Sequence, residues 1–212
     1  MKKIIVLIFF LIATYYLHGQ KKDSVVKWVF EFNGGINNCV LDPGNAKTGK
    51  EQKKITPHFG FSELHAIARG ARISFGVSYH FFSYDANPHP VYSSQMVLFP
   101  LRFIICTNES KKVFLHLHFG AEPGFITSNP SGWKGFPIFL SAGGNLNYHF
   151  SSRGGAIEAG YYYSFQMNSF KEMSYTNSWS YFNNPTSGYS GVNSISHSLS
   201  YMVFYIGFKT GI

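Results

Sequence analysis

Two histidines and a glutamate, His116, His118 and Glu122, stand at even spacing within one extended segment. Successive side chains of a β-strand point to opposite sides, so these three residues fall on one face. Histidines two positions apart can share a metal ion, but no further cysteine or acidic partner is placed beside them. We therefore expect a hydrogen-bonded polar network here, with no metal and no cofactor.

Charged residues recur on the polar face of other extended segments. If these faces meet inside a closed sheet, the charges must pair or reach water. We expect opposite charges to pair. The alternative is that these residues line a path for protons or solutes. The predicted network comprises Glu31, Arg72, Arg102, His116, His118, Glu122 and Glu158, with Glu63 as a further candidate.

The opposite face of the same segment is apolar for about 30 Å at roughly 3.3 Å per residue. It carries Val113, Leu115, Leu117, Phe119 and Ala121. A strand with one apolar and one polar face of this length suits a bilayer crossing, with lipid outside and a polar lumen inside.

Eight segments of this kind are expected, at residues 27–37, 55–67, 71–84, 92–106, 113–127, 135–150, 156–169 and 196–209. Long connections alternate with short polar turns, as in bacterial outer-membrane barrels. The sequence thus predicts an all-β fold, an eight-stranded antiparallel up-and-down transmembrane β-barrel whose lumen is filled by side chains. The face of the second strand is ambiguous, because Glu63 shares the parity of Phe59 and Phe61. In the last strand we expect four residues to face lipid: Leu199, Tyr201, Val203 and Tyr205.

Residues 1–20 have the pattern of a secretory signal peptide, with Lys2 and Lys3 before an apolar run at residues 4–17. The run is too short to be the preferred spanning helix, although a retained anchor is the alternative. Residues 21–212 then form the barrel. Removal of the signal peptide takes away Lys2 and Lys3 and lowers the formal net charge from +8 to +6.

Composition also separates classes of protein. Aromatic residues make up 18% of the chain and charged residues 13%, which favours lipid-facing walls and interfacial girdles over a soluble exported domain. No basic run with interleaved aromatics predicts nucleic-acid binding. Cys39 and Cys106 are expected at opposite ends of the barrel, too far apart for a disulfide.

The longest connection, residues 170–195, is rich in Ser, Asn and aromatic residues. With residues 38–54 beside it, we expect this loop to form a recognition surface that uses Tyr175, Trp179, Tyr181, Phe182 and Tyr189; an interfacial girdle is the alternative. Catalysis is not expected, although His80, His197 and Ser198 fall near one rim.

Three stretches carry a family resemblance: FPLRF at 99–103, GAEPG at 120–124 and GGNLNY at 143–148. They resemble the motifs of small outer-membrane β-barrel proteins of Bacteroidetes, over about residues 28–209. Some members of that family, called PorT-like, belong to a type IX secretion apparatus, which the resemblance offers as one role.

The expected function is that of a non-enzymatic outer-membrane barrel with a structural or surface-interaction role, including accessory service to protein secretion. A narrow, porin-like channel for small solutes is the first alternative, and a lipid A-modifying enzyme is the second. The expected partners are outer-membrane lipid and a protein at the outer loops or the periplasmic face.

Overall fold

The computed structural model describes residues 28–42, 52–53, 55–85, 91–107, 109, 111–128, 136–150, 155–168, 170–174 and 193–211. The expected signal peptide lies outside these residues. Within them, all strands belong to one antiparallel sheet. The strands are β1 (Trp28–Asp42), β2 (Gln52–Lys53), β3 (Ile55–Ala68), β4 (Ala71–Asp85), β5 (Val91–Leu98), β6 (Leu101–Cys106), β7 (Val113–Ser128), β8 (Ile138–His149), β9 (Ala156–Gln166), β10 (Phe170–Ser174) and β11 (Asn193–Gly211).

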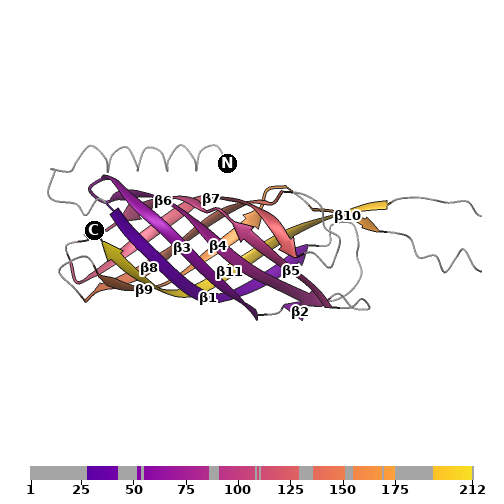
Figure 1. Ribbon diagram of the computed structural model, residues 1–212, viewed down its shortest axis with the longest axis horizontal. Coiled ribbons are helices and arrows are strands. Elements are labelled where there is room, and N and C mark those ends of the chain that lie inside the picture. Colours follow the sequence, from indigo (N-terminus) through magenta and orange to yellow (C-terminus); the bar gives the residue numbers. More distant parts are fainter. Residues whose placement is uncertain are drawn as a thin grey trace, which may run out of the picture.

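The sheet closes on itself, because β1 pairs with β11 from Val29↔Gly211 to Asp42↔Ser198. β5 and β6 together form one wall, and the short β2 and β10 are additions at the margin, so the barrel has eight walls. Its strands run obliquely to the long axis (Figure 1). The predicted fold, an eight-stranded up-and-down barrel, is confirmed.

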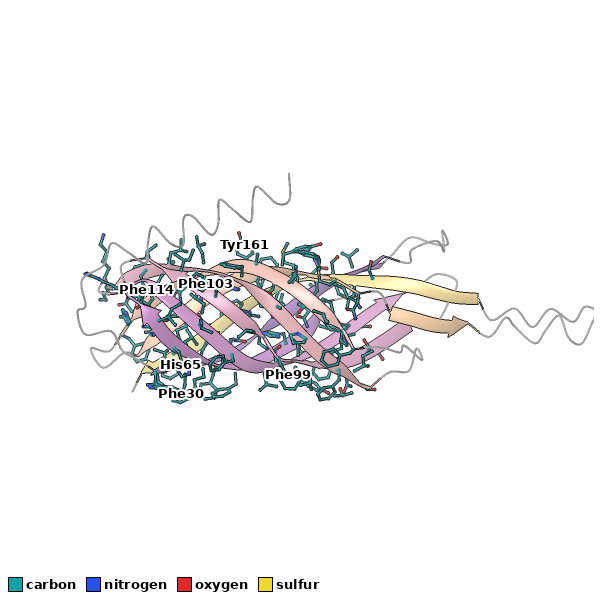
Figure 2. All side chains as sticks on the ribbon, turned by 90° about the horizontal axis from the view of Figure 1, so that it is seen from above. Phe30, His65, Phe99, Phe103, Phe114 and Tyr161 are labelled. Atoms are coloured by element: carbon teal, nitrogen blue, oxygen red, sulfur yellow. The ribbon has the colours of Figure 1, made fainter. Side chains whose placement is uncertain are left out.

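The wall strands alternate between an apolar exterior and a polar interior. In β4, Phe75 and Val77 are 44% and 41% exposed, whereas Ser74 and Ser78 are each 3% exposed. Side chains fringe the outside of the barrel (Figure 2), and the buried side chains occupy its inside. An apolar exterior on a closed barrel matches a lipid environment, since hydrocarbon solvates apolar side chains and offers no partner to the backbone.

The wall made of β5 and β6 was expected to be one continuous strand. Instead it is interrupted at Phe99 and Pro100, because proline has no N–H to donate to the ladder. The gap is bridged by two backbone hydrogen bonds, from the Phe99 N–H to the Pro123 carbonyl at 2.7 Å and from the Gly76 N–H to the Pro100 carbonyl at 3.1 Å. The wall therefore keeps its place in the barrel.

The ambiguous face of β3 is settled by its neighbours. Glu63 shares the outer parity of Phe61, while Ser62 and Leu64 are buried inside. The Glu63 carboxylate lies 3.3 Å from Nε2 of His65, on the side of the short turn at residues 69–70. The short turns of outer-membrane barrels lie at the periplasmic end and the longer loops at the outer end. Glu63 is thus an outward residue close to the rim and not part of the lumen network.

The expected faces of β11 are wrong. Leu199, Tyr201, Val203 and Tyr205 are at most 5% exposed and point into the lumen. The lipid-facing set of the same strand is Phe204, Ile206 and Phe208, which are 44–68% exposed. Both faces of this strand are apolar, so alternation alone could not choose between them.

Strands replace parts of two expected loops. β1 continues to Asp42 instead of stopping at residue 37, because its pairing with β11 extends to Ser198. Phe170–Ser174 forms β10, which pairs with the start of β11 beyond the other walls (Figure 1). The aromatic residues proposed for recognition, at positions 175, 179, 181, 182 and 189, lie outside the described residues.

Of the residues described, none lies in a helix with the length and apolar character needed to cross a membrane.

The corrected face of β11 can be tested with lysine substitutions. Ile206 stands opposite Gly34, near the middle of β1, and is 68% exposed, so Ile206→Lys should destabilise the barrel by about 2–4 kcal/mol. Thr210→Lys, near the rim, should cost only about 0–1 kcal/mol. Denaturant unfolding in lipid vesicles measures both. Equal losses in the two variants would contradict the lipid-facing assignment of Ile206.

Candidate functional site

The charged and histidine residues predicted for the lumen network are all buried. Their exposed fractions lie between 0% and 7%, and they come from five wall strands, β1, β4, β6, β7 and β9. These residues are Glu31, Arg72, Arg102, His116, His118, Glu122 and Glu158. Buried charges need partners, because desolvation without compensation is costly. The lumen interior is therefore the candidate site.

The centre of the lumen holds an ion pair between Arg102 of β6 and Glu122 of β7. Nε of Arg102 donates to Oε1 of Glu122 at 3.2 Å, and Nη2 donates to the same oxygen. The other carboxylate oxygen accepts hydrogen bonds from the Tyr201 hydroxyl and from Ser164 Oγ, the latter at 3.2 Å. The guanidinium carbon lies 4.4 Å from the centre of the Tyr162 ring. Both charges are thus held from several walls.

A glycine lets the two strands of this pair approach each other. Gly120 stands directly opposite Arg102 in the β6–β7 ladder. A Cβ atom at Gly120 would overlap the carbonyl oxygen of Leu101 and lie 2.7 Å from Cα of Arg102. Both are backbone atoms, which cannot move aside without shifting β6.

A second charged layer is centred on Lys209 of β11. Its ammonium lies 2.8 Å from Oε2 of Glu158 and 3.4 Å from Oε2 of Glu31. The same group donates to Oδ1 of Asn147 at 2.8 Å and lies 3.1 Å from Nδ1 of His116. One lysine therefore connects β1, β7, β8, β9 and β11.

The third layer lies at the periplasmic end, where Glu109 of the β6–β7 turn meets the lumen wall. Arg72 donates to both of its carboxylate oxygens at 2.9 Å, from Nε and from Nη2. Nε2 of His116 lies 3.1 Å from Oε1, and Nε2 of His149 lies 3.0 Å from the backbone oxygen of Glu109. Burial alone would raise the pKa of Glu109, but hydrogen bonds from His116 and Arg72 hold that pKa well below its usual value.

Towards the outer end, histidines take the place of charges. The rings of His58 and His80 lie 4.4 Å apart. His80 hydrogen-bonds Asn37 Oδ1 at 3.2 Å and Ser78 Oγ at 3.0 Å, and His58 hydrogen-bonds Asn33 at 3.0 Å. These contacts fill the lumen above the Arg102 layer with neutral polar groups.

Above the histidines an apolar cluster occupies the lumen. Its buried members include Cys39, Phe82, Met96, Leu98, Phe139 and Leu199, packed with tyrosines of β9 and β11. Phe82 and Phe139 each lie about 5 Å, ring centre to ring centre, from Tyr201, at 5.2 and 5.1 Å. The lumen beyond the histidines is therefore mainly apolar.

The three residues first considered for metal binding have separate partners. Glu122 is engaged by Arg102, whereas His116 meets Glu109 and Lys209. His118 lies edge-on to Tyr162, with ring centres 5.9 Å apart. These contacts do not bring the set His116, His118 and Glu122 to a common point.

Sequence reasoning missed Glu109, Lys209 and Tyr201 as lumen residues. Glu109 was assigned to a polar turn, and the other two were lost with the incorrect face of β11. One signal was present. The predicted lumen set contained three glutamates but only two arginines, so one negative charge had no counter-charge. Exchanging the two faces of β11 places Lys209 in the lumen as the third cation.

The rim candidates for catalysis are not drawn together by the described contacts. His80 is fully buried and bonded within the lumen. In the backbone ladders, His197 is opposite Phe170 and Ser198 is opposite Asp42. Cys39 and Cys106 are both free and buried, one in the outer apolar cluster and one in a small cluster with Val29, Leu64 and Ile104.

No protein-family model matches this chain, and no curated protein matches its sequence. Solved structures match its fold. Neisserial surface protein A has a TM-score of 0.56 at 10% identity, over 87% of this chain and 97% of that one. OprG, an outer membrane protein from Pseudomonas aeruginosa, has a TM-score of 0.56 at 10% identity, over 88% of this chain and 97% of OprG. The outer membrane protein AlkL has a TM-score of 0.50 at 8% identity, over 92% of this chain and 96% of AlkL.

The protein thus has the fold of small outer-membrane β-barrels, and the outer membrane is its location. That conclusion rests equally on the apolar exterior of the closed barrel. The fold supports no particular activity, because barrels of this kind serve different functions.

The central ion pair makes a double-mutant cycle informative. Arg102→Met leaves Glu122 buried without its counter-charge and should cost about 3–5 kcal/mol of unfolding free energy. Adding Glu122→Gln removes the stranded charge, and its amide can still bond Tyr201 and Ser164, so most of the loss should be recovered. Denaturant unfolding in vesicles measures the cycle. A double variant no more stable than Arg102→Met would contradict the pairing.

The close approach at Gly120 gives a second test. Gly120→Ala should destabilise the barrel by about 1–3 kcal/mol, because the new Cβ meets backbone atoms of β6. Gly34→Ala is the matched control. Its Cβ would have no neighbour closer than 3.7 Å, so its stability should stay within about 1 kcal/mol of wild type. The same unfolding assay compares them, and an equal response of both glycines would refute the steric argument.

Proposed function

We propose that this protein is a non-enzymatic outer-membrane barrel that works through its surfaces and not through its lumen. Its role is structural or interactive, with a protein partner at the outer end or the periplasmic face. The observation that carries the proposal is the filling of the lumen along its length, by three charged layers and an outer apolar cluster.

The filled lumen argues against the narrow channel. An eight-stranded barrel has room for little more than its own side chains. Ions passing through would have to separate Arg102 from Glu122 and then cross the hydrocarbon around Phe82 and Phe139. Both steps are costly, because charge transfer into apolar surroundings is strongly unfavourable.

The site chemistry also favours a non-enzymatic role over lipid modification. His80 has its ring nitrogens bonded to Asn37 and Ser78 inside the barrel, away from lipid. A hydrolytic site needs a nucleophile, a base and an oxyanion-binding group together. The described contacts give His80 a place in packing, not in such a set.

The outer end offers the favoured interaction surface. β10 and β11 pair from Phe170↔His197 to Ser174↔Asn193, and carry the chain beyond the other walls (Figure 1). The aromatic residues proposed for recognition, among them Trp179 and Tyr181, belong to the segment that connects these two strands and lies outside the described residues. One fold neighbour is named a surface protein, and the resemblance to PorT-like barrels of Bacteroidetes makes accessory service to secretion the finer form of this proposal.

Conductance separates the surface role from the channel directly. The protein reconstituted in a planar bilayer should produce no discrete conductance steps, because the lumen is filled. A wide porin in the same bilayer is the positive control. Reproducible steps that scale with the amount of inserted protein would establish the channel instead.

A deletion tests the outer end. Removing residues 175–190 leaves every described strand intact, so the variant should keep the gel shift between folded and boiled protein that marks a closed barrel. It should also reproduce whatever defect deletion of the whole gene causes. Full complementation by the shortened protein would place the function in the barrel or at its periplasmic side.

A further inference from the structure

Three potential metal ligands converge at the periplasmic end of the lumen. The Cys106 sulfur, a carboxylate oxygen of Glu109 and a ring nitrogen of His116 all lie within 4.8 Å of one another. Cys106 and His116 stand directly opposite each other in the β6–β7 ladder. Glu109 reaches them from the turn that connects these two strands. The hairpin thus brings all three to one point.

The donor set has a definite chemical preference. Thiolate, imidazole and carboxylate together suit zinc and similar borderline ions, whereas calcium and magnesium require oxygen ligands. With bonds of about 2.0–2.3 Å, ligand atoms around a tetrahedral zinc are about 3.5 Å apart. The cluster needs only small side-chain movements to reach that spacing.

Neighbouring groups hold one of the ligands in place and set the protonation state of another. Arg72 contacts both carboxylate oxygens of Glu109 at 2.9 Å. Oε2 has a second lone pair for a metal, and Oε1 regains one when the His116 proton leaves Nε2. His116 accepts a hydrogen bond from Lys209 at Nδ1, so its ring is neutral, which is the form that binds metals. A supporting contact such as that of Arg72 typically orients a metal ligand.

The charges around the cluster favour a cation. Glu31, Glu109 and Glu158 carry three formal negative charges, and Arg72 and Lys209 carry two positive ones. These five residues therefore have a surplus of one negative charge. A divalent ion bound together with a Cys106 thiolate adds one net positive charge and balances them.

We propose that Cys106, Glu109 and His116 form a binding site for a zinc-like divalent ion, which fastens Glu109 to the ends of β6 and β7. The ion enters from the periplasm, where the Glu109 side chain is 24% exposed, and solvent fills its fourth position. On binding, the Cys106 thiol releases its proton to solvent. The His116 proton moves from Nε2 to Nδ1, and Lys209 turns to its other acceptors.

Cobalt provides the direct test, because cobalt bound to a thiolate absorbs light by sulfur-to-metal charge transfer. The folded protein is purified in detergent, reduced, stripped with a chelator and titrated with Co²⁺. We expect a charge-transfer band that saturates at one equivalent and is abolished by Zn²⁺ but not by Ca²⁺ or Mg²⁺. Absence of the band from the wild-type protein would overturn the proposal without any need for a variant.

Matched variants then locate the ion. Cys106→Ser should abolish the band, whereas Cys39→Ser, which removes the other buried cysteine, should keep it. Glu109→Gln changes only a turn residue and should weaken zinc binding by more than the roughly 10–100-fold that loss of a supporting contact costs. Glu63→Gln, at the outward Glu63–His65 pair, should leave the affinity unchanged.

The gel shift on heating verifies that each variant is folded before titration. If Cys106→Ser does not fold, Glu109→Gln decides the matter, since the strands are untouched. Zinc affinity equal to wild type in folded Glu109→Gln, or an unchanged band in folded Cys106→Ser, would refute the site.

Discussion

Closure of the sheet by the β1–β11 ladder is the constraint on which the rest of the structure depends. Hydrocarbon offers no hydrogen-bond partner, so an open sheet edge in lipid would leave its backbone groups unpaired. The ladder from Val29↔Gly211 to Asp42↔Ser198 removes both edges at once. It also divides every wall strand into a lipid face and a lumen face. All further choices of residue follow from this division.

The small lumen created by closure has to be packed, and it is packed mostly by contacts between distant segments. Tyr201 of β11 reaches Glu122 of β7 across the interior. Lys209 of β11 contacts four residues from four other strands: Glu31, His116, Asn147 and Glu158. Buried pairs of this kind contribute little net stability once desolvation is counted. Their geometry is satisfied by one arrangement of the walls, so we interpret them as fixing the register.

Much of the architecture could be predicted from the sequence, because the lipid face and lumen face impose a period of two on each strand. The alternation in β7 assigned Leu117 and His116 to opposite faces, as observed: their exposed fractions are 48% and 2%. Loop lengths gave the order of the walls. The lumen set was readable for the same reason, since a charge such as Arg102 within an apolar strand has only the interior available to it.

Position in space decided what local pattern left open. Both faces of β11 are apolar, and only the need of Glu122 for Tyr201, and of Glu31 and Glu158 for Lys209, selects one of them. The sequence determines which side chains share a face of a strand, and for most walls this was enough to tell the lipid face from the lumen face. Which of two apolar faces turns inward depends on partners brought by other strands, and only the closed barrel supplies them.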